Sequence, residues 1–313
     1  LKEKKLNHAI PLIEKLISID PSDDDFIFRI ALLCFDNERY NLAEKYFNIL
    51  LSKFYVPDNI NFFLGQIDYK NKRYDEALLH YQRIQQGTFV NVKTLNVSKA
   101  LLKKYNLEKA LSHIDKEIKI KNQDNLLNSL SLKLSIFEEI GESADIIKLS
   151  SQILKSFPNN ERALYSRAIA YEKEANILSM SKDFDQMIKL NKYNSIALNA
   201  YGYSLALHKL HLDKSENLIR KALDIRPGQA AILDSLAWVL YLKGSYKEAA
   251  KYSSLAYSKD QDPEIIEHHY LILLKNGNSN EAKYILNQSI KNNPNSEKLL
   301  KLLDNSKNAA IKL

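Results

Sequence analysis

The stretch NFFLGQIDYKNKRYDEALLHY (Asn61–Tyr81) carries two small residues, Gly65 and Ala77, twelve positions apart. Such small residues recur about every 34 positions, a period typical of repeated helix–turn–helix units. In two units the second small residue is replaced by Met180 and Ser215. In the other units it is an alanine: Ala9, Ala43, Ala77, Ala110, Ala144, Ala249 and Ala282. We therefore predict that Gly65 and Ala77 are buried where two antiparallel helices of one unit meet.

The repeated units also predict how the chain is organised. A single helix pair cannot bury its apolar face alone, so neighbouring units stack around a core that grows along one axis. Only 7 Gly and 7 Pro occur in 313 residues, which favours long helices and few loops. We expect one continuous superhelix over residues 1–313, with four parts: a half repeat (1–21), more divergent repeats (22–158), better-kept repeats (159–294) and a capping helix (295–313).

Composition excludes several classes of protein. The net charge of +7 comes from lysines and arginines mixed with acidic residues, without a basic block, so it does not indicate sequence-specific nucleic-acid binding. The single cysteine, Cys34, cannot form an internal disulfide or a cysteine-based metal site, and its apolar neighbours predict a core position. No apolar stretch of about 18 residues occurs, so no membrane span is predicted.

The start of the chain raises an expectation about what precedes it. The sequence opens Leu-Lys-Glu, inside the second helix of a repeat whose first helix is missing. We expect that the natural N-terminus has been removed, together with any signal peptide or lipid-attachment cysteine.

Several of these segments resemble the tetratricopeptide repeat family. The first helix of a repeat is represented by NFFLGQIDY (Asn61–Tyr69) and LNAYGYSLA (Leu198–Ala206), and the second by alanine–aromatic pairs such as Ala77 and Tyr81. The resemblance covers nearly the whole chain. It implies an all-α fold, a right-handed α-solenoid of about eight to nine helix-turn-helix repeats, and a concave groove that binds other proteins.

A narrower resemblance lies in the C-terminal third. Its residues are ALNAYGYSLA (Ala197–Ala206), ILDSLAWVLYLKGSYKEAAKYSSLAY (Ile232–Tyr257) and DPEIIEHHYLILLKNGNSNEA (Asp262–Ala282). These segments are similar to proteobacterial repeat proteins that are outer-membrane lipoproteins and act as adaptors of carboxyl-terminal processing proteases. The resemblance implies a bacterial periplasmic location, with a protease and cell-wall hydrolases as partners. The alternative location is the cytoplasm.

The first helix of each repeat is expected to line the groove, which makes its outward-facing residues the candidate binding site. Aromatic anchors flanked by acids and amides suit an extended or helical peptide. The groove residues predicted in this way are Tyr165, Asn199, Tyr203, Asp234, Trp238, Tyr241 and Glu267. In the alternative interpretation, Trp238, the single tryptophan, and Tyr241 only pack between neighbouring helices.

Two other groups of side chains are weaker candidates for a binding site. Lys99 and Lys103 form a partial basic patch, but the paired lysines and asparagines of a carboxylate clamp are missing. His208 and His211 have a spacing that can bind metal, yet they are expected to be exposed at a helix end, and the adjacent His268 and His269 should point in different directions.

No nucleophile, phosphate-loop or metalloprotease motif with its partner residues occurs, so no catalytic, cofactor or metal site is predicted. The sequence favours a non-catalytic protein-binding adaptor or scaffold, with proteins or peptides as partners and no nucleic acid. The alternatives are an accessory region of a larger enzyme, such as a glycosyltransferase, and a self-assembling scaffold.

Overall fold

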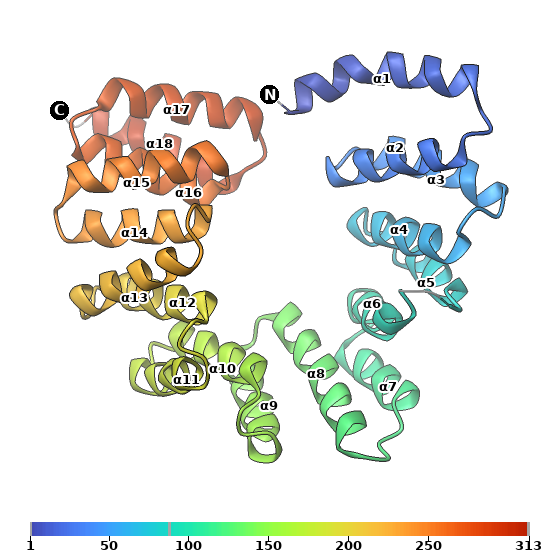
Figure 1. Cartoon of the computed structure of the whole chain (residues 1–313), viewed down its shortest axis with the longest axis horizontal. Coiled ribbons are helices and arrows are strands. Elements are labelled where there is room, and N and C mark those ends of the chain that lie inside the picture. Colours follow the sequence, from blue (N-terminus) through green and yellow to red (C-terminus); the bar gives the residue numbers. More distant parts are fainter. Residues whose placement is uncertain (1, 87–88, 312–313) are drawn as a thin grey trace. The chain divides into compact units, whose positions relative to one another are not determined.

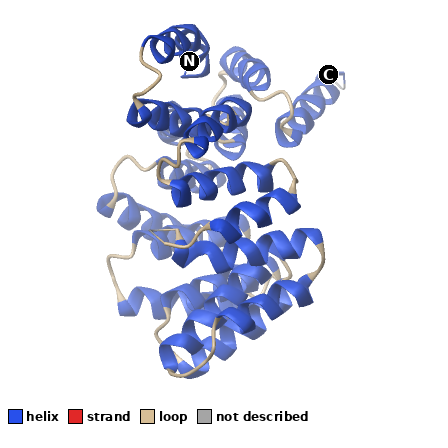
Figure 2. Cartoon of the chain, turned by 90° about the vertical axis from the view of Figure 1, so that its right-hand side faces the viewer, coloured by secondary structure: helices blue, strands red, loops and turns tan. Residues whose placement is uncertain are grey.

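A computed structural model describes residues 2–86 and 89–311, and the side chains of 10–86, 89 and 92–305. In those ranges the chain forms 18 α-helices and no strand (Figures 1 and 2). The structure divides into two compact units, residues 1–149 and 150–313. The single continuous solenoid stays a prediction, because each unit is described by itself. The side chain of Ala9 and those of the capping helix beyond residue 305 lie outside the described residues.

The helices of the first unit follow one another with short connections. Their bounds are α1 Lys2–Ile19, α2 Asp24–Asp36, α3 Tyr40–Ser52, α4 Pro57–Lys70, α5 Tyr74–Arg83, α6 Val90–Lys104, α7 Leu107–Glu117 and α8 Gln123–Ile140. Helix α9, Ser143–Ser156, runs across the boundary between the units.

The second unit repeats the pattern. Its remaining helices are α10 Glu161–Lys173, α11 Ile177–Leu190, α12 Ser195–Leu207, α13 Leu212–Ile225, α14 Ala230–Leu242, α15 Tyr246–Lys259, α16 Pro263–Lys275, α17 Ser279–Asn292 and α18 Glu297–Ile311.

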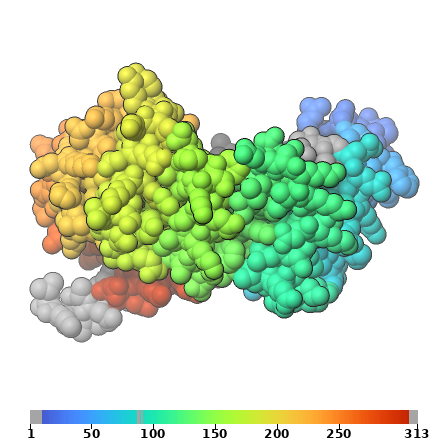
Figure 3. Space-filling model, turned by 90° about the horizontal axis from the view of Figure 1, so that it is seen from below, coloured from blue at the N-terminus to red at the C-terminus, as the bar shows by residue number. Residues whose placement is uncertain are grey.

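Packing follows the repeat in both units. Within each unit, pairs of consecutive helices pack together, such as α2 with α3 or α14 with α15, and the second helix of such a pair packs on the first helix of the next. The first helices of neighbouring repeats also meet, α12 with α14 and α14 with α16. Figure 3 shows the chain in space-filling form, in which segments that follow one another in the sequence lie side by side within each unit. The predicted all-α fold of stacked helix pairs is therefore confirmed.

Asparagine side chains start many of these helices. The side-chain oxygens of Asn160, Asn176 and Asn194 accept hydrogen bonds from the backbone N–H three residues on. These N–H groups have no partner inside the helix, and each such cap stabilises a helix by about 1 kcal/mol. Asparagine caps thus mark where α10, α11 and α12 of the second unit begin.

The turn inside seven of the repeats contains one residue in the left-handed region. It is glycine in three repeats and a side-chain-bearing residue in four: Glu38, Lys72, Gly141, Ala175, Lys209, Gly244 and Gly277. Gly141, Gly244 and Gly277 adopt this conformation without the steric cost that a side chain brings. A left-handed residue lets the chain reverse directly after a helix, which keeps the two helices of a pair antiparallel.

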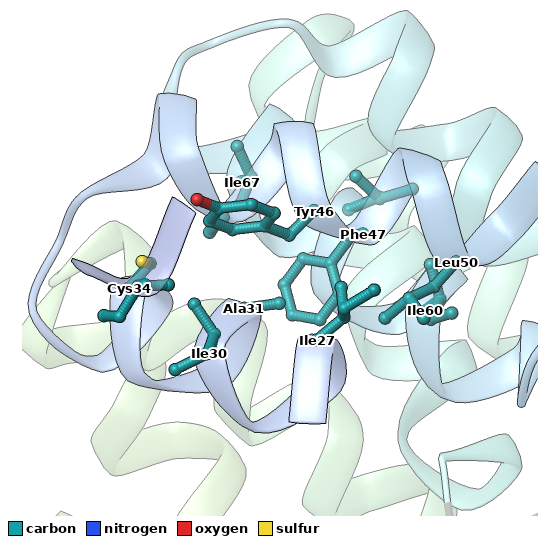
Figure 4. Packing of buried hydrophobic residues seen from close by; sticks show 12 residues of the cluster. Ile27, Ile30, Ala31, Cys34, Tyr46, Phe47, Leu50, Ile60 and Ile67 are labelled. Atoms are coloured by element: carbon teal, nitrogen blue, oxygen red, sulfur yellow. The ribbon is translucent and has the colours of Figure 1, made fainter. Parts of the chain in front are cut away.

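The core of the first unit is continuous across its first repeats. Ile27, Ala31 and Cys34 of α2 pack against Phe47 of α3 and Ile60 of α4 (Figure 4). Cys34 is 1% exposed, which confirms the core position predicted for it.

The small residues lie at helix contacts as predicted. Gly65 on α4 and Ala77 on α5 are both buried. A Cβ atom on Gly65 would come within 2.5 Å of the Tyr81 ring, and one on Gly202 would meet the backbone oxygen of Ser215 at 2.8 Å. The absence of a side chain at Gly65 and Gly202 is therefore what allows these helices to approach so closely.

The variant Gly65→Leu should lower the free energy of unfolding by about 1–3 kcal/mol, because the added side chain has no room beside Tyr81. The matched control is Gln82→Leu, which adds the same side chain at an exposed position of α5. Thermal melts followed by far-ultraviolet circular dichroism compare the two. Equal melting temperatures for both variants and the parent would contradict this packing.

Candidate functional site

Two adjoining cavities, each of about 360 Å³, lie on the first helices of the repeats in the second unit. Cavity A is formed by α10, α12, the α13–α14 connection and the start of α14. Cavity B is formed by α12, α14, the α15–α16 connection and the start of α16. Asn199, Tyr203 and Ala231 line both cavities, so the two make one continuous surface along these helices. Figure 1 shows α10, α12, α14 and α16 following one another in that order.

Four of the seven predicted groove residues line this surface. Tyr165 is in cavity A, Asp234 is in cavity B, and Asn199 and Tyr203 are in both. Tyr165 is held by an edge contact with the buried ring of Phe184, at 6.2 Å between centroids. The helical phase inferred from the sequence therefore placed these four residues, which come from three consecutive first helices, on one surface.

Trp238 and Tyr241 line neither cavity. Their rings stack at 5.0 Å between centroids, and Trp238 also stacks on His268 at 4.2 Å. Trp238 is half-buried between these two rings. Glu267, also outside the cavities, forms an ion pair with Lys298 of α18 at 2.9 Å. These three residues flank the cavities and are already in contact with groups of the chain itself.

Asp234 differs from expectation, since an exposed groove residue was predicted and the structure buries it to 5% exposure. The reason is its neighbour on the next repeat: Oδ2 of Asp234 hydrogen-bonds with Nδ1 of His268 at 2.8 Å. The other carboxylate oxygen, Oδ1, has no hydrogen-bond partner among the described residues. Burial raises the pKa of Asp234, and the contact with His268 opposes that shift.

Acidic residues gather at the mouth of cavity B. Asp260, Asp262 and Glu264 are exposed and line it. Asp262 caps α16 by accepting a hydrogen bond from the backbone N–H of Glu264, and the Tyr203 hydroxyl donates to Glu264 Oε1 at 2.5 Å. Burial, followed by that hydrogen bond, raises the pKa of the Tyr203 phenol, which stays protonated and remains a donor.

A second histidine–carboxylate contact, beside that of Asp234 with His268, joins neighbouring repeats at cavity A. Nε2 of His208 lies 2.8 Å from Oε1 of Glu172, and Glu172 lines the cavity beside Arg226. The expectation that His208 is simply exposed at a helix end is therefore wrong, because a carboxylate one repeat earlier reaches it. His268 and His269 do point to different partners, as predicted: His269 Nδ1 hydrogen-bonds with Ser253 Oγ at 2.8 Å.

The sequence interpretation missed His268, Glu264 and Glu172. A usable signal existed, because the Asp234–His268 and Glu172–His208 pairs are 34 and 36 residues apart, close to one repeat. Polar residues of opposite character at that spacing can meet on neighbouring first helices.

The first unit offers no comparable unpaired groups at its basic patch. Lys99 and Lys103 of α6 both form ion pairs with Glu139 of α8, at 3.3 and 3.2 Å, and Tyr69 donates to the same carboxylate. The Glu139 carboxylate offsets part of the positive charge of the patch. This arrangement does not favour capture of a carboxylate from a partner.

No group of three or more His, Cys, Asp or Glu side chains lies close enough to hold a metal ion within the part of the chain that the structure describes. None of the helices in that part combines the length and apolar character that crossing a bilayer requires.

Comparison with known proteins finds other proteins that contain repeats of this kind. Residues 28–88 match a family model described as tetratricopeptide repeat. Residues of the chain are 27% identical over 211 positions to the TPR repeat-containing protein PA4667 of Pseudomonas aeruginosa, and 26% identical over 312 positions to the TPR repeat-containing protein MJ1428 of Methanocaldococcus jannaschii. The family-model match and both relatives therefore support tetratricopeptide repeats in this chain. The alignments cover 67% and 80% of the chain but only 36% and 54% of those relatives, so the chain spans about a third to a half of their length.

Solved structures agree on the fold. A tetratricopeptide repeat protein from Parabacteroides merdae aligns with a TM-score of 0.56 at 15% identity, over 79% of this chain and 98% of that one. The type IV pilus biogenesis factor PilW aligns with a TM-score of 0.55 at 16% identity, over 69% of this chain and all of that one. Tetratricopeptide repeat proteins generally mediate protein–protein interactions, and no enzyme family is indicated by the matched family model or the two curated relatives.

Proposed function

We propose that this chain is a non-catalytic adaptor or scaffold that binds a segment of another protein along the surface made by cavities A and B. The observation that carries the proposal is the continuity of the two cavities through Asn199, Tyr203 and Ala231. A surface that spans the four neighbouring first helices α10, α12, α14 and α16 suits an extended or helical segment, because side chains along such a segment can enter successive cavities. Half-buried aromatic rings beside polar groups supply the anchors that peptide binding uses.

The resemblance of the C-terminal third supports a finer form of this proposal. In that form the chain is part of an outer-membrane lipoprotein of a bacterial periplasm, and it brings a carboxyl-terminal processing protease to its cell-wall hydrolase substrates. The whole protein's partners and location are proposed together with this role, since the chain spans only part of the relatives it matches.

The test of the proposal is a blocking substitution on the shared wall of the two cavities. Ala231 is exposed and lines both, so Ala231→Trp fills them with little disturbance to the core. A partner captured on the immobilised chain from extracts of the native cell is purified, and its affinity is measured by calorimetry. We expect Ala231→Trp to weaken binding at least tenfold, which corresponds to about 1.4 kcal/mol.

The matched control is Ser254→Trp, which adds the same ring at an exposed position of α15 that lines neither cavity. It should bind the partner as the parent chain does. Equal affinity of all three proteins would remove this surface from the account, and equal losses in both variants would assign the effect to a general property of the added ring.

A further inference from the structure

We propose that cavity B receives the guanidinium group of an arginine side chain from the bound partner segment, an inference that rests on the proposed function. The inference follows from the charge of the cavity, from an unsatisfied buried acceptor in its wall, and from the geometry of the groups around that acceptor.

The charge of cavity B is one-sided. Four of the residues that line it are acidic: Asp234, Asp260, Asp262 and Glu264. No lysine or arginine is among the described residues that line it, although the chain as a whole carries a net charge of +7. A concave site lined by one sign of charge attracts ligands of the opposite sign.

Helix capping explains part of this acidity. Asp262 caps α16, Asp260 accepts a hydrogen bond from the backbone N–H of Asp262, and acidic residues are stabilised at the first turn of a helix. Glu264 already accepts a hydrogen bond from Tyr203. These three exposed carboxylates would be ordinary at a helix start, and they do not by themselves indicate a ligand.

Asp234 is not explained in this way. It lies in the middle of α14 and is nine-tenths buried, and His268 satisfies only one of its two oxygens. A buried carboxylate oxygen without a donor loses its hydrogen bonds to water and gains none from the protein, which destabilises the folded chain. Asn199, which lines the same cavity, also has a buried Oδ1 without a partner among the described residues. Both unsatisfied atoms are acceptors, so a ligand that completes them must bring donors.

A guanidinium group matches these requirements better than an ammonium group. It presents five N–H donors in a planar fork that can contact several oxygens at once, and it remains charged at any physiological pH. Its flat faces also stack on aromatic rings, and Tyr203 lines this cavity. The expected contacts are therefore to Asp234 and Asn199 at the wall and to Glu264 at the mouth.

The probe for this proposal is the peptide acetyl-Gly-Arg-Gly-amide, with the citrulline peptide as a neutral control of nearly the same shape. The readout is the indole N–H signal of Trp238 in NMR spectra of the full chain. Trp238 is the only tryptophan, and its ring stacks on His268, which holds Asp234. We expect a saturable shift of this signal with the arginine peptide and no saturable shift with the citrulline peptide.

Two variants and a control locate the effect. Asp234→Asn removes the buried charge and should weaken binding of the arginine peptide about tenfold or more. Glu264→Gln, at an exposed position, should weaken it about threefold without affecting folding. Asp185→Asn removes the same charge from an exposed site on α11 and should change nothing. Melting curves identify a variant that has lost its fold, and Glu264→Gln keeps the proposal testable if Asp234→Asn does not fold.

Equal responses to the two peptides, or equal affinities in Glu264→Gln and Asp185→Asn, would overturn the arginine assignment. Such a result is distinguishable from failure of the proposed function. If Ala231→Trp still abolishes partner binding while the arginine peptide gives no specific response, the surface binds its partner by other contacts.

Discussion

The variant Phe184→Ala should lower the free energy of unfolding of the second unit by about 3–5 kcal/mol. Phe184 on α11 is fully buried. Its ring stacks on Tyr201 at 5.3 Å between centroids and meets the ring of Tyr165, the cavity residue, edge-on. Truncation to alanine therefore leaves a void in the core and removes the support beneath one wall of cavity A.

The measurement is urea unfolding followed by the fluorescence of Trp238, which lies in the second unit. Tyr193→Ala is the matched control, because this ring is 65% exposed in the connection before α12. It should change the unfolding free energy by less than about 0.5 kcal/mol. Similar losses in the two variants would mean that α11 and α12 do not pack as described.

The second large effect is a dependence of stability on pH through His269. Burial lowers the pKa of this imidazole from 6.5 to about 4, with Glu281 opposing the shift weakly. The unfolded chain therefore binds a proton at a higher pH than the folded chain does. The contribution of neutral His269 to stability is fully present above about pH 6.5 and is lost as the pH falls toward 4. At about 1.4 kcal/mol per pH unit, the loss amounts to about 3 kcal/mol.

His269→Gln provides the comparison, because glutamine keeps a polar group near Ser253 Oγ but cannot take up a proton in this range. The difference in unfolding free energy between the parent and His269→Gln should shift by about 3 kcal/mol in favour of the variant between pH 7 and pH 4. Urea unfolding at both values measures it. A difference that is the same at the two pH values would show that His269 is protonated equally in the folded and unfolded chains.

The fold could be predicted from the sequence because the residues that determine it recur at a regular spacing. The spacing of Gly65 and Ala77 recurs through the chain, and small residues at that spacing have one structural use, the close approach of two helices. The same periodicity indicates which side of each first helix faces the groove. Tyr165, Asn199 and Tyr203 could therefore be assigned to one surface from the sequence alone.

The burial of each residue on that surface, and the side chain that it contacts, could not be predicted in the same way. Asp234 and Trp238 share the helical phase, but the partner of each is His268, which lies on the following repeat. Periodicity in one helix says nothing about which side chain of the next helix reaches across. For the same reason the ion pairs of Lys99 and Lys103 with Glu139 became visible only in the structure.

The central claim is that the surface shared by cavities A and B binds another protein, and photo-crosslinking tests it most directly. A benzoylphenylalanine is placed at Ala231 in one full-length chain and at Ser254 in another, and each is irradiated with the partner captured from native extracts. We expect a crosslinked product at position 231 and none at position 254. A crosslink at 254 without one at 231 would contradict the claim.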